Sequence, residues 1–172
     1  PDLAIVGDMI VGYPSETDED FEASLSLLRA VQYKTVYVFK YSVRPNTVAE
    51  KLHADDVDEV TKKAHNNRML QVQQEIALGH HTAMIGKKVQ VLVEGAARVD
   101  PQEQDKAPRD DDGNVLYPLG RKPRSARSDG TARLTARTRG DHIVAFDGST
   151  DLVGKLVDVT ITRATPLSLS AT

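Results

Sequence analysis

Residues 8–21, DMIVGYPSETDEDF, carry an apolar run that stops at a turn, after which a helix begins almost at once. The continuous apolar residues at 9–11 are typical of a parallel strand that is covered on both faces. Gly12 and Pro14 end this run. The stretch therefore predicts a strand, a tight loop and a helix, which together form a unit of an α/β layer fold.

The helix of this unit is predicted to cover residues 17–32. Thr17 is the expected N-cap, because its hydroxyl can accept a hydrogen bond from the Asp20 amide, and acidic residues in the first turn favour the positive end of the helix dipole. Its apolar face is formed by Phe21, Leu25 and Leu28, supported by Leu27 and Val31. Because ligands collect at the C-terminal ends of strands in α/β folds, residues 12–16 are expected to form a functional rim.

A second strand is predicted at residues 35–41, TVYVFKY, and the crossover between the two strands makes them parallel. The loop at 42–47, SVRPNT, would then lie on the same rim. Pro45 fixes one backbone angle and Asn46 tolerates a positive φ. We therefore expect a tight turn that holds Arg44 in a set direction.

A long helix is predicted at residues 57–78, with an apolar stripe of Met69, Val72 and Ile76 and with Gly79 as the C-cap. The side chains expected to be solvated on its other face are Lys62, Lys63, Arg68, Gln73 and Gln74.

After residue 79 the sequence changes to the alternation of short strands, at 87–95, 131–139, 142–146 and 155–163. This pattern predicts a small all-β barrel or sandwich. We expect an α/β domain at 1–80 and a β domain at 81–172, with an insertion at 98–130 that has almost no apolar periodicity and that we expect to be mostly mobile.

Charge and amino-acid composition limit the functional classes to which this chain can belong. The 172 residues have a formal net charge of -3, so any basic surface for a nucleic acid must be local. The absence of cysteine excludes disulfides and cysteine-held clusters within this chain and is what a cytoplasmic protein would show. No apolar run approaches membrane-spanning length, and no initiator Met precedes the first strand. We therefore expect a cytoplasmic protein of which this is a C-terminal portion.

Six motifs occur in order along the chain: IVGYPSETDEDF at 10–21, KYSVRPNT at 40–47, VLVEGAAR at 91–98, LTARTRGDHIVAF at 134–146, LVGKLVDVTIT at 152–162 and PLSLS at 166–170. Together they resemble the tRNA methylthiotransferase family, the 2-methylthio-N6-isopentenyladenosine synthases. The resemblance implies an enzyme with an N-terminal cluster-binding domain, a radical S-adenosylmethionine barrel of the TIM-like type, and a C-terminal TRAM (OB-like) β-barrel. This chain would supply the last strand–helix units of the radical barrel and the TRAM domain.

The resemblance also implies cofactors, which are S-adenosylmethionine and two [4Fe–4S] clusters in the full-length parent. The cluster cysteines would lie upstream, so this chain alone should be inactive and should hold no metal. Within the chain, Ile10 and Gly12 would lie near the adenosine of S-adenosylmethionine, with Glu16 closing the turn. Arg44 is a candidate for a carboxylate or phosphate contact. The alternatives are ordinary strand and turn packing for Ile10 and Gly12, helix capping for Glu16, and a surface ion pair for Arg44.

The implied partner is the tRNA anticodon stem-loop, held by the β domain of a monomer. The candidate RNA-binding residues are Arg133, Arg137, Arg139, His142, Lys155 and Arg163. A barrel face that carries them could follow phosphates without reading sequence. The alternative is a set of solvated strand charges.

The chain departs from the family pattern at several positions. Ala136, Asp141, His142 and Ser170 replace the usual Gly, Asn, Arg and Arg, so RNA affinity through the barrel is in question. The basic run at 121–127 could compensate. Ser15 and Asn46 stand where the family usually has Gly, which suggests altered rim turns. His80 and His81 form the one adjacent histidine pair, for which a helix-end role is favoured over metal binding.

Two other functions remain open from the sequence. One is the related methylthiotransferase that modifies an aspartate of a ribosomal protein. The spacing of Arg137, Thr138, Val144 and Phe146 favours the tRNA enzymes over it. The other is a non-catalytic TRAM-type RNA-binding protein that has kept part of a barrel.

Overall fold

The computed structural model describes residues 3–97 and 130–172. The chain divides into two compact units, of which one is Ile5–Ala77 and the other contains Leu78–Thr172. Within the described residues, no helix combines the length and the apolar character needed to cross a bilayer. The insertion expected at 98–130 lies outside these residues except for Gly130.

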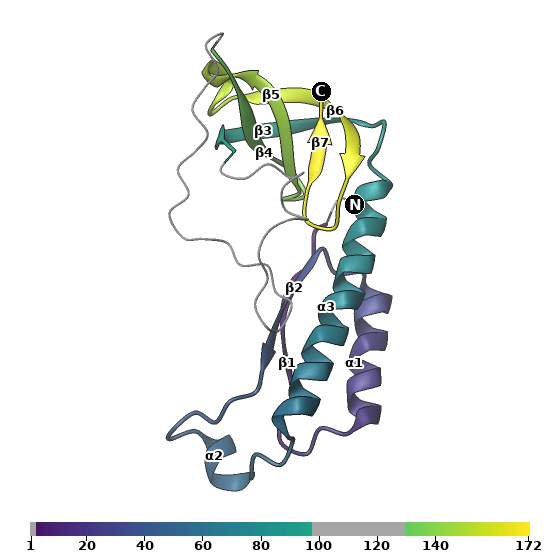
Figure 1. Ribbon diagram of the computed structural model, residues 1–172, viewed down its shortest axis with the longest axis vertical. Coiled ribbons are helices and arrows are strands. Elements are labelled where there is room, and N and C mark those ends of the chain that lie inside the picture. The colour runs from purple at the N-terminus through teal and green to yellow at the C-terminus, as the bar shows by residue number, and fades with distance from the viewer. Residues whose placement is uncertain (1–2, 98–129) are drawn as a thin grey trace. The chain divides into compact units, whose positions relative to one another are not determined.

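The first unit is a strand–helix–strand motif, as predicted. Strand β1 (Val6–Val11) pairs in parallel with β2 (Thr35–Lys40). Helices α1 (Asp18–Val31) and α3 (Glu59–Thr82) run alongside each other against this two-stranded sheet (Figure 1). The first unit therefore consists of a two-stranded parallel sheet and the helices that cover one of its faces.

One face of the two-stranded sheet packs on the helices, and the other is open. The buried core consists of Val11, Phe21, Leu25, Leu28, Val36, Met69, Val72 and Ile76. On the opposite face Val6, Ile10, Tyr37 and Phe39 are all at least half exposed. Ile10 is the register partner of Phe39, so these two apolar side chains come from directly paired positions.

Helix α1 has the predicted cap. The Thr17 hydroxyl accepts from the Asp20 amide, and the Asp20 carboxylate accepts from the Thr17 amide, which completes a capping box. At the other end Gln32 adopts a left-handed conformation, and its amide donates to the Leu28 carbonyl. Both helix ends thus satisfy backbone groups that would otherwise lack partners.

Helix α3 differs from the prediction in length and in its buried face. It ends at Thr82 and contains Gly79, so Gly79 is not a C-cap. Lys62 is 3% exposed and Gln73 is 7% exposed, although both were expected to be solvated. They lie on the same helical stripe as Met69 and Ile76, and this shared face buries them despite their polarity.

Polar side chains of α3 form hydrogen bonds to backbone carbonyls within β2 and just before it. The Gln73 side-chain amide donates to the carbonyls of Tyr33 and Lys34, at the entry to β2, at 3.2 Å each. The Asn66 side chain donates to the Val38 carbonyl at 3.4 Å. These hydrogen bonds explain how polar side chains of α3 can be buried although their polarity predicts exposure to solvent.

The loop after β2 forms the expected tight turn. Asn46 has φ 67°, and the Thr47 amide donates to the Arg44 carbonyl at 3.3 Å. Thr47 then caps a short helix, α2 (Val48–Leu52), which the sequence did not indicate. Five residues are too few to show a hydrophobic period.

The second unit contains a closed β-barrel, which confirms the predicted β architecture. The strands are β3 (Lys88–Ala96), β4 (Thr131–Thr138), β5 (Ile143–Ser149), β6 (Leu156–Ala164) and β7 (Leu169–Ala171), and a 3₁₀ turn η1 (Thr150–Leu152) precedes β6. They are ordered β3-β4-β5-β7-β6, with β3 paired to β6 (Figure 1). Closure leaves no open edge among these strands.

Strand β7 closes the barrel and was not predicted as a strand. It pairs in parallel with β5 and antiparallel with β6. The turn before it is held by Thr165, whose hydroxyl accepts from the Ser168 amide and donates to the Ser168 carbonyl. Three residues give too short an alternation to mark a strand, so only the tertiary pairing identifies it.

The barrel core explains one departure from the family pattern. Alternate residues of the strands point inward, including Val91, Leu134, Ala136, Val144, Phe146, Ile161, Leu169 and Ala171. Ala136 has no exposed surface. The change from Gly to Ala at this position therefore lies in the core and adds nothing to the outer charge of the barrel.

Candidate functional site

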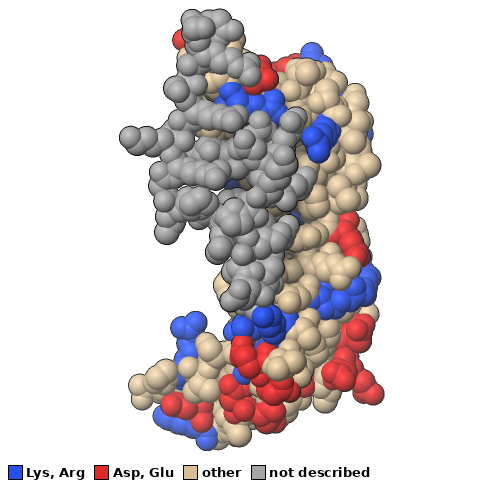
Figure 2. Space-filling model, in the orientation of Figure 1, with Lys and Arg blue, Asp and Glu red and all other residues tan. Residues whose placement is uncertain are grey.

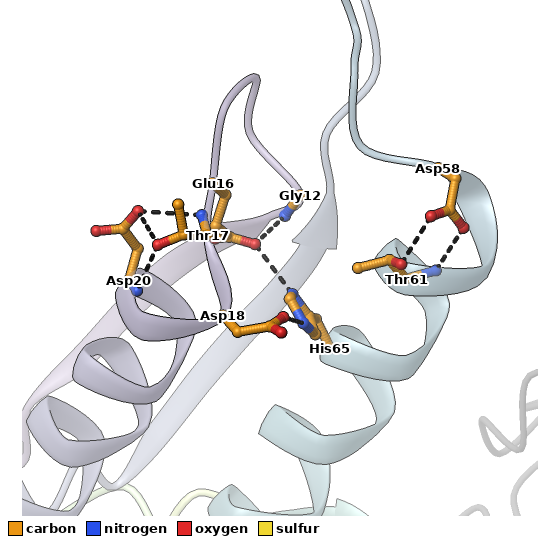
Figure 3. A network of polar contacts seen from close by, with 8 residues as sticks. All are labelled: Gly12, Glu16, Thr17, Asp18, Asp20, Asp58, Thr61 and His65. Carbon is orange, nitrogen blue, oxygen red and sulfur yellow. Dashed lines mark hydrogen bonds and ion pairs between the residues drawn. The ribbon is translucent and has the colours of Figure 1, made fainter.

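The rim loop after β1 is closed by Glu16, as the sequence suggested. Its carboxylate oxygen Oε2 accepts from the Gly12 amide at 2.7 Å (Figure 3). The Glu16 amide donates to the Tyr13 carbonyl at 2.9 Å. Gly12 and Ser15 both have φ 68°. Ser15 therefore keeps the left-handed backbone that a glycine at this position would favour, and the same is true of Asn46 in the second rim loop.

His65 of α3 joins this loop to the helix layer. Its Nδ1 lies 3.1 Å from Glu16 Oε2, the same oxygen that accepts from Gly12, and its Nε2 lies 3.6 Å from Asp18 Oδ1 (Figure 3). The imidazole stacks on the Phe21 ring, with centroids 3.8 Å apart. No motif in the sequence singled out His65. Its only signal was a place on the stripe of α3 that carries Lys62 and Met69.

Acidic residues at the start of α3 hold the loop from the other side. The Asp56 carboxylate accepts from the Ser15 amide at 2.7 Å, and Asp55 pairs with the buried Lys62 ammonium at 2.5 Å. Asp58 caps α3 by accepting from the amide and the hydroxyl of Thr61 (Figure 3). Acidic side chains gather over the end where α1 and α3 begin (Figure 2).

These contacts lower the pKa of two of the acids. The hydrogen bond from the Ser15 amide is the largest effect on Asp56 and lowers its pKa. The hydrogen bond from the Thr61 amide does the same to the pKa of Asp58. Both carboxylates are therefore anionic at neutral pH and stay available as acceptors for the backbone.

Aromatic rings lie next to the rim. Tyr13 packs edge-on against Tyr41, with centroids 5.2 Å apart, and lies 6.3 Å from the His53 ring. The Lys62 ammonium lies 5.4 Å from the Tyr41 centroid. The buried Tyr41 hydroxyl forms no hydrogen bond in the described part of the chain.

The structure brings together only part of the predicted cofactor site. Gly12 and Glu16 are in direct contact. Ile10 is 57% exposed on the open sheet face. Arg44 is exposed, and its guanidinium pairs with no carboxylate among residues 3–97 and 130–172. The surface ion pair considered for Arg44 is therefore not formed within these described residues.

The predicted RNA-binding residues lie on the barrel in different environments. Arg133 of β4 is mostly buried, with its side chain 17% exposed, and contacts Ser170 Oγ at 3.4 Å and Asp147 at 3.7 Å. Its Nε forms no hydrogen bond within the described residues. Arg163 of β6 is exposed and is the register partner of Ser170. Ser170 is thus a side-chain contact of Arg133 and the register partner of Arg163.

Arg137 is already paired with two carboxylates. Its guanidinium contacts Asp141 at 2.5 Å and Glu94 at 3.0 Å. The hydrogen bond to Asp141 raises the pKa of Arg137, so the side chain is charged but neutralised. Asp141, which replaces the usual Asn of the family, is one of the two acids.

His142 is half-buried and contacts another histidine. Its Nδ1 lies 3.0 Å from His81 Nε2, and His81 Nδ1 lies 2.5 Å from the Thr165 carbonyl. Since a carbonyl only accepts, His81 Nδ1 carries a proton. The His81 ring thereby links the end of α3 to the turn before β7, in agreement with the predicted helix-end role.

The remaining basic candidates are exposed. Arg139 lies in the turn between β4 and β5, Lys155 lies just before β6, and neither they nor Arg163 form an ion pair in the described part of the chain. Lys155 and Arg163 lie at opposite ends of β6. No group of three His, Asp or Glu side chains within the described residues is arranged to hold a metal ion.

Fold and site together define an α/β unit whose rim loop is fixed by side chains, followed by a small β-barrel with basic residues on its outer side. The chain is 34% identical over 169 residues to a tRNA-2-methylthio-N(6)-dimethylallyladenosine synthase of Aeromonas hydrophila, covering 98% of this chain and 29% of the relative. It is 35% identical to the synthases of Thermoanaerobacter sp. (95% and 28%) and Clostridium botulinum Okra (99% and 31%). No model of a protein family matches.

The chain is therefore similar over almost its whole length to tRNA-2-methylthio-N(6)-dimethylallyladenosine synthases, as its motifs indicated. It spans about three tenths of the length of these relatives.

Proposed function

We propose that this chain is the C-terminal portion of a tRNA methylthiotransferase that adds a methylthio group to C2 of N6-isopentenyladenosine next to the anticodon. The observation that carries the proposal is the identity of 34–35% over almost the whole chain with synthases of that name. In the proposed parent, the α/β unit is the end of a radical S-adenosylmethionine barrel and the β-barrel is a TRAM domain.

The open sheet face supports the first assignment. An isolated pair of parallel strands with Ile10 and Phe39 half exposed is what one segment of a larger parallel barrel would present. The rest of that barrel would come from the part of the parent that this chain does not cover.

The rim is the proposed place for S-adenosylmethionine. Arg44 fits its carboxylate, because the guanidinium is exposed and has no acid partner among the described residues. Ile10 offers an exposed apolar side chain on β1, the strand that leads into the rim loop. When bound, the cofactor supplies the methyl group and the means of activating an unreactive adenine carbon.

The iron–sulfur clusters do not fit this chain. It has no cysteine, and the described residues contain no alternative metal-binding group. Any cluster of the parent must be held by residues elsewhere, and the residues of this chain act only on the ligand or on the RNA.

The exposed residues Arg139, Lys155 and Arg163 are the proposed phosphate contacts for the anticodon stem-loop. Arg133 and Arg137 are already engaged with protein groups. They would contribute only after exchanging those partners for phosphate.

A chimaera tests the proposal. This chain replaces the homologous segment of the Aeromonas synthase, and the product is expressed in a strain that lacks its own synthase. We expect mass spectrometry of digested tRNA to show restored 2-methylthio-N6-isopentenyladenosine. The control chimaera lacks Leu78–Thr172 and should leave the unthiolated nucleoside.

A folded chimaera that holds iron and still fails to thiolate tRNA would contradict the proposal. If the same chimaera instead modified a ribosomal protein, the related aspartate methylthiotransferase would be the correct function. The names of the relatives favour tRNA.

A further inference from the structure

We propose that His65 is a positioning residue: it holds the Glu16 carboxylate on the Gly12 amide and thereby sets the affinity of the rim loop for S-adenosylmethionine. The identity of the ligand rests on the proposed function. The control of the loop by His65 rests on the geometry alone.

A single oxygen atom carries the connection. Glu16 Oε2 is 2.7 Å from the Gly12 nitrogen and 3.1 Å from His65 Nδ1. The side chains of Glu16 and His65 are each 11% exposed, so water competes little for these contacts. A carboxylate that accepts from two donors at low exposure is fixed in one orientation, and losing one donor leaves it partly unsatisfied.

The imidazole is fixed in its turn. Its plane lies 3° from that of Phe21, which is 4% exposed, and its Nε2 is near Asp18. Phe21 and Asp18 both belong to α1, whereas His65 belongs to α3. The ring is thus clamped between the two helices, and the loop end of β1 is attached to that rigid layer through Glu16.

The loop needs such support because its backbone is not intrinsically stable. Gly12 and Ser15 both have positive φ, which is a strained conformation for a serine. Side chains from outside the loop hold it in place, with His65 acting on Glu16 and Asp56 on Ser15. A ligand that binds the held conformation would bind more weakly to a loop that has to be ordered first.

The same contacts show what His65 does not do. Both donors meet Oε2 of Glu16, so this oxygen supports the loop instead of contacting the ligand. His65 acts through Glu16 and likewise need not touch the ligand.

Two substitutions separate the hydrogen bond from the stacking. His65→Asn places an amide donor near the position of Nδ1 and loses the ring, whereas His65→Phe keeps the ring and loses the donor. The hydrogen-exchange rate of the Gly12 amide, measured by NMR in the full chain, should stay close to the wild-type rate in His65→Asn. In His65→Phe it should be about tenfold faster or more, the scale of one buried hydrogen bond.

Calorimetric titration with S-adenosylmethionine gives the functional measurement. We expect a dissociation constant about tenfold weaker for His65→Phe and within about twofold of wild type for His65→Asn. Asn66→Ala is the matched control, because it removes a neighbouring contact of α3 to the Val38 carbonyl. It should change thermal stability without changing Gly12 exchange.

Unchanged Gly12 exchange in His65→Phe, or equal affinity in both variants, would overturn the proposal. If the wild-type chain does not bind S-adenosylmethionine, the rim assignment of the proposed function fails, and the Gly12 exchange still decides whether His65 positions the loop. If His65→Phe does not fold, Glu16→Gln keeps the shape and removes the charge. It should then raise Gly12 exchange, and no rise would count against the proposal.

Discussion

The side chain of Lys62 fills the space beside Gly12. A Cβ atom at position 12 would lie 2.3 Å from Lys62 Cγ, which is closer than real Cβ atoms approach other atoms. Gly12 also has φ 68°, a conformation that favours glycine. Glycine is thus required at the end of β1 both for its backbone conformation and for its lack of a side chain.

Gly12→Ala should destabilise the first unit by about 1–3 kcal/mol, because the strained backbone and the contact with Lys62 both oppose the new methyl group. Urea unfolding followed by circular dichroism measures this change. In a Lys62→Ala background the loss should be smaller, because alanine lacks the Cγ, Cδ and Cε atoms that the new methyl group would meet. An equal loss in both backgrounds would show that the contact with Lys62 contributes nothing.

Releasing Arg137 should strengthen RNA binding. In the double variant Asp141→Asn and Glu94→Gln, the guanidinium loses both carboxylate partners and can neutralise a phosphate. Anisotropy titrations with an anticodon stem-loop at several salt concentrations should show a slope of log K against log salt that is steeper by about one unit. Stability should change by only about 0–1 kcal/mol, because these ion pairs are exposed.

The control for this experiment is Asp158→Asn, which removes an acid from the exposed Lys88–Asp158 pair on another part of the barrel. It changes the net charge without freeing Arg137. A gain in slope as large as that of the double variant would mean that net charge alone governs RNA binding.

Replacing an exposed basic residue should change RNA binding more than replacing one that is already paired with acids. Lys155→Ala should reduce the salt slope by about one unit and weaken all RNA sequences alike, because Lys155 is exposed without an ion-pair partner in the described residues. Arg137→Ala should have the smaller effect on the slope, since two acids already neutralise this arginine. The reverse order would show that Arg137 exchanges its partners readily for phosphate.

Stability should fall in acid partly through Asp56. Its pKa is lowered in the folded protein, chiefly by the Ser15 amide, so its contribution is complete above the unfolded value near 3.9 and is lost as pH falls through the folded value. The difference in unfolding free energy between wild type and Asp56→Asn, measured from pH 7 down to pH 3, should shrink toward the acid end.

Asp56→Ala serves as the comparison, because Asn can still accept from the Ser15 amide through its carbonyl oxygen whereas Ala cannot. The alanine variant should be the less stable of the two at neutral pH. A difference between wild type and Asp56→Asn that does not vary with pH would contradict the assignment.

Local sequence signals determined the parts of the fold whose cause is local. The Thr17 cap, the Asn46 turn and the alternation of the barrel strands follow from neighbouring residues, and all are present in the structure. The resemblance to the synthases likewise came from the order of motifs alone. These features need only hydrogen bonds over a few residues or a repeating apolar pattern.

The tertiary structure decided which charges are free and which polar residues are buried. Lys62, His65 and Gln73 lie on one stripe of α3 and find partners on other elements, so their polarity predicted exposure incorrectly for Lys62 and Gln73. Similarly, Arg137 and Lys155 look alike in the sequence, and only the fold brings two acids to one of them. A side chain's charge is local, whereas its burial and its partner depend on residues far away in the chain.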